Sequence, residues 1–219
     1  MRIVEPGFFE YLGSRWDSIL EAAIAHAQLV AFALAAAALT GMVLGILTYR
    51  RPFAAEAVLA VASTILTIPS FALFALMLPL LGIGFLPAFV ALWLYGILAI
   101  LRNTITGLRG VDPAITESAQ GMGMSNFQQL LRIELPLAWP VIIAGIRTSG
   151  LLLMGIAAIG AAVGSPGLGD DIFSGLARVG GANALNLVLG GTLGIVVLAV
   201  LFDALMGFIG RLTTSRGMR

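Results

Sequence analysis

Long uncharged segments alternate with short charged ones along this chain. Because about 20 apolar residues cross the hydrocarbon core of a bilayer, each long uncharged segment is a candidate membrane-spanning helix. The first covers residues 22–49, and residues 57–101 are long enough for two spans, separated at the Pro- and Gly-containing stretch LPLLGIGFLP. Two further spans run from about 136 to 163 and from about 186 to 209. The pattern predicts an all-α polytopic membrane protein with five transmembrane helices.

Composition supports a membrane protein and excludes several function classes. Apolar residues make up 59% of the chain and charged residues 11%, whereas soluble domains hold about 45–50% and about 25%. All 12 basic residues are Arg, and the net charge of +1 gives no electrostatic case for nucleic acid. Without Lys the chain has no phosphate-binding loop of its own, and without Cys and with one His no metal site is predicted. If the protein uses ATP, a partner must hydrolyse it.

The distribution of Arg predicts the orientation, because positively charged connections stay in the cytoplasm. Five spans put the termini on opposite sides. One side holds eight Arg residues, namely Arg50, Arg51, Arg102, Arg109, Arg132, Arg211, Arg216 and Arg219. The other side holds three, namely Arg2, Arg15 and Arg178. We therefore expect a protein of the inner membrane, with its N-terminus outside and its C-terminus in the cytoplasm.

These assignments divide the chain into three parts. Residues 1–21 form a lead-in on the outer side, residues 22–210 form the membrane domain, and residues 211–219 form a cytoplasmic tail. The lead-in mixes aromatic and charged residues, which suits either an amphipathic helix in the outer interface or an ordered surface segment without membrane contact. The largest cytoplasmic feature is the loop at 102–135 between the third and fourth spans.

Local signals predict a compact structure inside this loop. Asp112 followed by Pro113 is a helix N-cap with Pro at the first helical position, so a short helix begins there. Gly121 and Gly123 end it. Ser125, with Gln three residues later, matches a capping box that begins a second helix leading toward the fourth span. A structured loop between two spans is a docking surface.

The loop also carries a family motif. The pattern EAA, three residues, Gly, nine residues and I-x-LP resembles the cytoplasmic signature of ABC importer permeases. Here it reads Glu117, Ser118, Ala119, Gly123, Ile133, Leu135 and Pro136. Ser118 departs from the family's Ala. The stretches TIPSFALFALMLPLLGIG, IELPLAWPVIIAGIRT and GAAVGSPGLGDDIFSGL resemble permeases for osmoprotectants such as glycine betaine, choline, carnitine or proline, and the likeness covers almost the whole chain.

The resemblance implies a MetI-like type I ABC importer fold and a subunit that works within an assembly. It implies an identical or paralogous permease subunit, two ATPase subunits that bind ATP and Mg, an external solute-binding protein, and contact with membrane lipid. This chain would be non-catalytic and hold no cofactor. Residues 112–126 would be the coupling helix that enters a cleft on the ATPase. The implied ATPase-coupling residues are Asp112, Glu117, Ser118, Ala119, Gly121, Gly123, Leu135 and Pro136.

Two charges fall inside predicted spans, and charges at that depth are costly unless paired. Arg147 and Asp203 lie at similar depth, at about 12–16 Å from the cytoplasmic ends at ~1.5 Å per residue, so they can form a pair. The alternative is that Arg147 reaches the cytoplasmic interface while Asp203 meets a backbone or hydroxyl group.

Other candidate residues have ordinary structural explanations beside the functional ones. The aromatic residues Phe71, Phe74, Trp93 and Tyr95 suit a path for a trimethylammonium group through cation–π attraction, or simple packing. Pro69 is expected to kink the second span beside that path. In the outer connection, Asp170 and Asp171 suit docking of a binding protein, or plain solvation. His26 is interpreted as an interfacial residue rather than a proton relay.

Small residues at the spacing GxxxG let helices approach closely, and we interpret them here as packing rather than as a dimer seam. The three pairs are Gly41 with Gly45, Gly160 with Gly164, and Gly190 with Gly194.

Three alternative functions stay open at the level of sequence. The first is a type I ABC permease for another small solute, such as an amino acid. The second is an ATP-independent secondary transporter, for which we would expect functional ionisable residues at the midplane or paired broken helices. The third, an intramembrane enzyme, lacks a nucleophile and base placed together.

Overall fold

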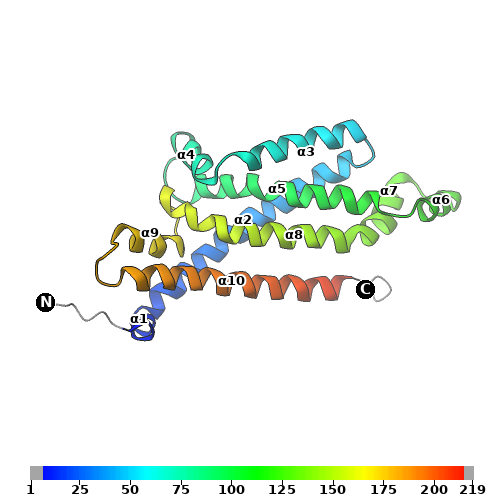
Figure 1. The fold of residues 1–219 in the computed structure, drawn as a ribbon. Coiled ribbons are helices and arrows are strands. Elements are labelled where there is room, and N and C mark those ends of the chain that lie inside the picture. Colours follow the sequence, from blue (N-terminus) through cyan, green and yellow to red (C-terminus); the bar gives the residue numbers. More distant parts are fainter. Residues whose placement is uncertain (1–6, 215–219) are drawn as a thin grey trace. The chain divides into compact units, whose positions relative to one another are not determined.

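The structure is a computed structural model that describes residues 7–214, and within this range the chain is helical without strands. Arg2, Arg216, Arg219 and the tail beyond residue 214 lie outside the described residues, as do the predictions made for them. The helices (Figure 1) are α1 (Phe8–Ser14), α2 (Trp16–Thr48), α3 (Pro52–Thr67), α4 (Ser70–Leu81), α5 (Phe85–Arg109), α6 (Pro113–Gly121), α7 (Asn126–Gln129), η1 (Leu130–Glu134), α8 (Leu135–Ala157), η2 (Ala158–Val163), α9 (Gly169–Ala177) and α10 (Ala184–Thr213).

Four helical segments of the described chain are long and apolar enough to span a membrane. They are Trp16–Thr48, Phe85–Arg109, Asn126–Val163 and Ala184–Thr213. The broken pair α3 and α4 brings the number to five if the two helices are counted as one span. This agrees with the predicted number of spans, with the difference that the second span is not one continuous helix.

The second span breaks where the sequence predicted a kink. Pro69 has φ −55° and ψ 133°, an extended conformation, and α4 begins at the next residue. Proline has no N–H to donate, and its ring disfavours a helical conformation for the residue before it, here Ile68. Both effects act at the end of α3, so the helix ends there instead of bending and continuing.

The first span begins earlier than predicted. The helix α2 starts at Trp16, inside the predicted lead-in, and α1 is separated from it by Arg15, whose φ of −120° is not helical. Charged residues between positions 16 and 21 concealed this start, because the prediction took the first uncharged residue as the beginning of the span. A helix that crosses a membrane can extend into water with charged residues at its end.

Contacts divide the chain into two compact groups, and the long helices contribute to both. The outer group contains residues 7–34, 68–93 and 150–202, and the loop group contains residues 35–67, 94–149 and 203–214. We name the first the outer group because it holds the connection predicted outside, and the second the loop group because it holds the loop with α6. Each group is described below by itself.

Close helix contacts in the loop group depend on glycines. A Cβ on Gly45 would lie 2.6 Å from Thr104 Cγ2, and one on Gly41 would lie 3.1 Å from Ile100 Cβ. These contacts join α2 to α5 and agree with the interpretation of this GxxxG pair as packing. On α8, a Cβ on Gly145 would lie 2.6 Å from Asn103 Cβ, so α8 approaches α5 in the same way.

The outer group contains a helix that the sequence analysis missed. The helix α9 lies in the connection that was expected to be a charged loop, and its Gly169, Asp171 and Gly175 are buried. A Cβ on Gly169 would meet the carbonyl oxygen of Ala158 at 2.1 Å, and one on Gly175 would meet that of Ala184 at 2.7 Å. Glycines that let backbones touch hold α9 against its neighbours, although they read as loop signals in sequence.

Candidate functional site

The helix α6 of the predicted coupling loop begins as its sequence predicts. Asp112 is the N-cap, its Oδ1 accepts a hydrogen bond from the N–H of Ala114 at 2.9 Å, and Pro113 occupies the first turn. Ser118, the departure from the family motif, donates its hydroxyl to the carbonyl oxygen of Ala114 at 2.7 Å. The hydroxyl of the substituted serine therefore has a hydrogen-bond partner within the helix.

The bend after α6 requires one glycine and not the other. Gly123 has φ +81°, which side chains rarely adopt, while a Cβ at either Gly121 or Gly123 would meet nothing within 4 Å. Backbone conformation, not space, therefore explains Gly123. The capping box predicted after the bend is present: Gln128 N donates to Ser125 Oγ at 3.3 Å, and Ser125 N donates to Gln128 Oε1 at 2.9 Å.

The surface of this loop is partly apolar. Glu117 and Ser118 are exposed, whereas Ala119 is fully buried beneath them. Three large apolar side chains around the bend are also exposed, namely Ile115 at 43%, Met122 at 72% and Phe127 at 66%. We call these three residues with Glu117 the loop patch. Ile115 lies on α6, Met122 directly follows α6, and Phe127 lies on α7. Exposed apolar side chains on a structured loop are typical of an interaction site.

Leu135 and Pro136 begin α8 after a wider turn. The chain between α7 and α8 is the π-helical turn η1, Leu130–Glu134, so the second loop helix continues into the fourth span. Pro136 explains this turn, because its ring would clash with the carbonyl of Arg132 in an ordinary α-helix and it has no N–H to donate. The helix predicted to begin at Ser125 and to lead toward Pro136 therefore runs through η1 into α8.

A group of polar residues at the base of the loop was missed by the sequence analysis. Glu134 is 5% exposed, and its Oε2 accepts a hydrogen bond from the hydroxyl of Tyr49 at 2.5 Å. Arg50 Nη2 donates to both carboxylate oxygens at 3.1 Å. Arg109 Nε donates to the carbonyl oxygen of Tyr49 at 2.8 Å. We call these four residues the base cluster. Glu134 occupies the variable position of I-x-LP, which gave no signal of its own.

The surroundings of Tyr49 keep its phenol protonated. Burial raises the pKa of the Tyr49 phenol, and the neighbouring Glu134 carboxylate raises that pKa further. Tyr49 therefore keeps its proton at neutral pH and remains the donor to Glu134. The Arg50 guanidinium also lies over the Tyr49 ring, 5.2 Å from its centroid. A buried carboxylate is stabilised by partners of this kind, which deliver hydrogen bonds and an opposite charge together.

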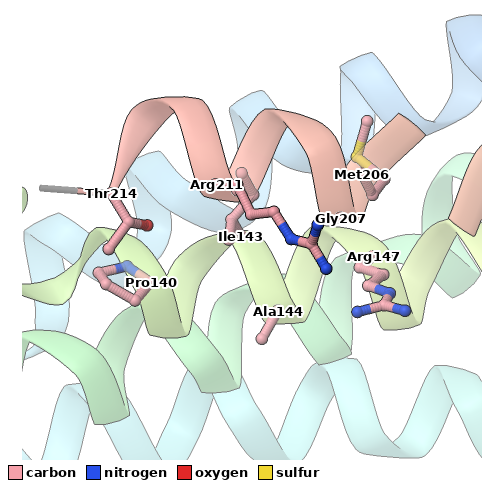
Figure 2. A pocket seen from close by; sticks show the side chains of 9 residues that line it. Pro140, Ile143, Ala144, Arg147, Met206, Gly207, Arg211 and Thr214 are labelled. Atoms are coloured by element: carbon pink, nitrogen blue, oxygen red, sulfur yellow. The ribbon is translucent and has the colours of Figure 1, made fainter. Parts of the chain in front are cut away.

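Arg147 and Asp203 form the ion pair that the sequence analysis considered. Arg147 Nε and Nη2 donate to the two oxygens of Asp203 at 2.5 and 2.6 Å, a two-point geometry that joins α8 to α10. Their side chains remain 46% and 36% exposed. Arg147 also lines an open pocket of about 280 Å³ that continues along α10 past Gly207 to Arg211 (Figure 2).

The candidate path residues differ in their surroundings. Phe74 and Tyr95 are buried, at 0% and 3% exposure, whereas Phe71 is 59% exposed. Pro69 lies at the break before α4, and Trp93 is half-buried on α5. Burial of Phe74 and Tyr95 agrees with packing in their respective groups. Exposure leaves Phe71 available to a ligand or a partner.

Two residues of the outer group differ from their interpretation in sequence. His26 is 1% exposed and its Nε2 lies 3.1 Å from the carbonyl oxygen of Met154, so it is a core residue and not an interfacial one. Asp171 is 9% exposed and pairs with Arg15 at 3.3 Å, so plain solvation is wrong for it. Asp170 is exposed, and its pKa is raised by desolvation from neighbouring groups and by the Asp171 carboxylate. In the part of the chain that the structure describes, acidic and His side chains form no cluster of three or more that could hold a metal.

Comparison with known families gives a match over most of the chain. Residues 37–215 match the family described as the binding-protein-dependent transport system inner membrane component. The choline transport system permease protein OpuBB of Bacillus subtilis is 37% identical over 96% of this chain and 95% of its own. The osmoprotectant import permease protein OsmW of Salmonella typhimurium is 40% identical over 89% of this chain and 91% of its own. The glycine betaine/carnitine/choline permease protein OpuCB of Bacillus subtilis is 37% identical over 89% and 88%.

Solved structures share the fold. A chain of the inward-facing MetNI methionine ABC transporter superposes with a TM-score of 0.78 at 22% identity, covering 90% of this chain and 96% of that one. A chain of an amino acid ABC transporter with histidines gives a TM-score of 0.76 at 16% identity, covering 94% and 98%. At these identities the likeness carries the fold and not the substrate. The predicted type I ABC importer permease fold is confirmed.

Proposed function

The chain belongs to the family of binding-protein-dependent transport system inner membrane components, and from this premise we propose that it carries osmoprotectants of the glycine betaine, choline and carnitine class. The observation that carries the proposal is the similarity to permeases named for these solutes over nearly the whole chain. The alternative substrate class, amino acids, has only fold-level similarity in its favour. The chain is a multi-pass permease of the inner membrane, and its relatives are transport subunits.

ATP would act on this chain through a separate subunit. The chain has no Lys with which to form a phosphate-binding loop, so an ATPase subunit must bind ATP and Mg. The loop patch supports α6 as the place where that subunit docks. The helix α6 is held by its own N-cap, and the loop around it exposes apolar side chains. Asp112, Gly123 and Pro136 would fix the shape of the loop, and Glu117 would contact the ATPase.

A second permease subunit completes the proposed path. The Arg147–Asp203 pair lies within segments that are apolar enough to span a membrane, yet both side chains are more than a third exposed. Charged groups there face water or protein rather than lipid, because lipid cannot solvate them. We place the pair on a face that an identical or paralogous permease covers. In a double-mutant cycle, each single change of Arg147 or Asp203 to Ala should lower the amount of folded protein more than the double change does. Additive losses would contradict the pair.

Orientation follows from the same assembly. If the loop patch meets an ATPase, then α6 and the C-terminal end of α10 lie in the cytoplasm, in agreement with the excess of Arg on that side. The connection that contains α9 then lies outside, where a solute-binding protein would deliver substrate. Reporter tags after Arg219 and within 109–112 should be cytoplasmic, and a tag at Gly180 should be external. Tags at Gly180 and Arg219 on the same side would contradict this arrangement.

Reconstitution tests the proposed function as a whole. Permease in liposomes with its ATPase and binding protein should take up labelled glycine betaine, choline or carnitine when ATP is supplied. Permease alone should not do so under an ion gradient. Robust gradient-driven uptake by the permease alone would favour a secondary transporter, and ATP-driven uptake of an amino acid in place of these amines would transfer the chain to another substrate class.

A further inference from the structure

The base cluster connects the two ends of the coupling loop through one residue. Arg109 is the last residue of α5 before the loop, and Glu134 is the last residue before α8. Both bind Tyr49, which follows the end of α2: Arg109 donates to its carbonyl oxygen, and its hydroxyl donates to Glu134. The two ends of the segment between Arg109 and Glu134 are therefore joined to each other through Tyr49.

The hydrogen bonds of the base cluster resist breaking, because they involve buried and charged groups. The Glu134 carboxylate is 5% exposed and accepts hydrogen bonds from a phenol and from a guanidinium. Charge-assisted bonds at a buried site are short and strong, and removal of one partner leaves the carboxylate poorly compensated. Tyr49 is itself 8% exposed, so water does not readily replace its hydroxyl. The ends of α2, α5 and α8 are therefore held together at one point.

The π-helical turn determines which residue reaches this point. The turn η1 ends at Glu134, immediately before Leu135 and Pro136 of the family motif. Because a π-helical turn is wider than an α-helical one, it changes the direction in which the residues before Pro136 project. The buried position of Glu134 is thus coupled to the turn that joins the loop to α8.

We propose that the base cluster transmits movement of the loop to the membrane helices, with Tyr49 and Glu134 as positioning residues. A force applied to α6 would reach α2, α5 and α8 together through Tyr49, instead of reaching α5 and α8 separately through the two ends of a flexible loop. The proposal rests on the proposed function, because it assigns these residues a role in coupling to an ATPase. It adds residues outside the loop helix to that role.

Tyr49→Phe is the sharpest test because it deletes one oxygen and keeps the ring. Glu134→Gln, which removes the charge, is the second variant. Tyr11→Phe is the matched control, since Tyr11 is also buried, and its hydroxyl accepts a hydrogen bond from Arg15 in the outer group, outside the base cluster. Each variant complex, with ATPase and binding protein in liposomes, is assayed for folded complex, for ATP hydrolysis and for glycine betaine taken up per ATP hydrolysed.

We expect Tyr49→Phe and Glu134→Gln to keep the assembled complex and its ATP hydrolysis, while uptake per ATP falls about tenfold, the factor that corresponds to one charge-assisted hydrogen bond. The Tyr11→Phe complex should match the unmodified one. Unchanged uptake per ATP in Tyr49→Phe would overturn the proposal, and so would a loss of uptake that only follows a loss of folded complex. Failure of the unmodified complex to show ATP-driven uptake of any solute would instead refute the proposed function.

Discussion

Within residues 7–214, two nine-residue helices lie in connections between longer ones, and they are held in different ways. The helix α6 depends on local interactions: an Asp112 N-cap, a proline in the first turn and a glycine with positive φ in the bend that follows. The helix α9 depends on tertiary contact, with Gly169 and Gly175 against neighbouring backbone and Asp171 paired with Arg15. In α6 Glu117 is exposed, whereas in α9 Asp171 is buried.

This difference indicates which helix is available to a partner. A helix that keeps its shape through its own caps can present its side chains without losing stability. The glycines and the carboxylate of α9 are used in contacts within the outer group, so a partner could bind only its other side chains, of which Phe173 at 36% and Leu176 at 54% are exposed. The loop patch on and after α6, with Ile115, Met122 and Phe127 exposed, fits a docking element, and α9 fits a structural brace of the outer group.

The largest expected effect is on α9. In Gly169→Ala the new methyl group would lie 2.1 Å from the carbonyl oxygen of Ala158, so backbone must move. We expect a loss of about 1–3 kcal/mol of stability, typical of overpacking, and a large loss of folded protein in detergent. Gly155→Ala is the control, because a Cβ there meets nothing within 4 Å and the change should be neutral or stabilising. Equal thermal stability of the two variants would contradict the close packing of α9.

In the bend after α6, the corresponding change should affect transport and not folding. Gly123→Ala forces a side chain into the φ +81° conformation, at a cost of about 1–2 kcal/mol, so the bend is populated about 5–30-fold less. We expect ATP-driven uptake to fall by a similar factor while the folded amount of the permease stays the same. Gly121→Ala, two residues earlier in open space and without positive φ, should keep full uptake. Equal uptake by both variants would show that the bend has no role in coupling.

The smallest effects concern the two carboxylates. Asp171→Asn removes the ion pair with Arg15 and should lower stability by about 1 kcal/mol, since Arg15 is partly exposed. Glu117→Gln should leave stability unchanged because Glu117 is exposed, and it should weaken ATPase association. Thermal unfolding and co-purification of the ATPase measure the two effects. The comparison of the helices fails if Glu117→Gln is the less stable variant.

Those parts of the fold and of the candidate site that depend on local signals could be predicted from the sequence. Caps, prolines and charge-free runs act within a few residues, so the start of α6, the capping box at Ser125 and the approximate spans could be predicted. The base cluster could not, because Tyr49 and Glu134 are far apart in sequence and their types suggest an interfacial aromatic and a surface charge. The helix α9 was missed for a related reason: its glycines serve tertiary contact, which a single sequence does not reveal. The burial of His26 follows the same principle.

Cross-linking tests most directly the claim that α6 docks on the ATPase. The chain contains no Cys, so a single introduced thiol is unique within it. Gln120→Cys places the thiol on the exposed side of α6, and Ala177→Cys places one at the exposed end of α9. In the assembled complex, a reagent that joins a thiol to an amine should link Gln120→Cys, and not Ala177→Cys, to the ATPase subunit. A cross-link to the ATPase from Ala177→Cys with none from Gln120→Cys would contradict the account.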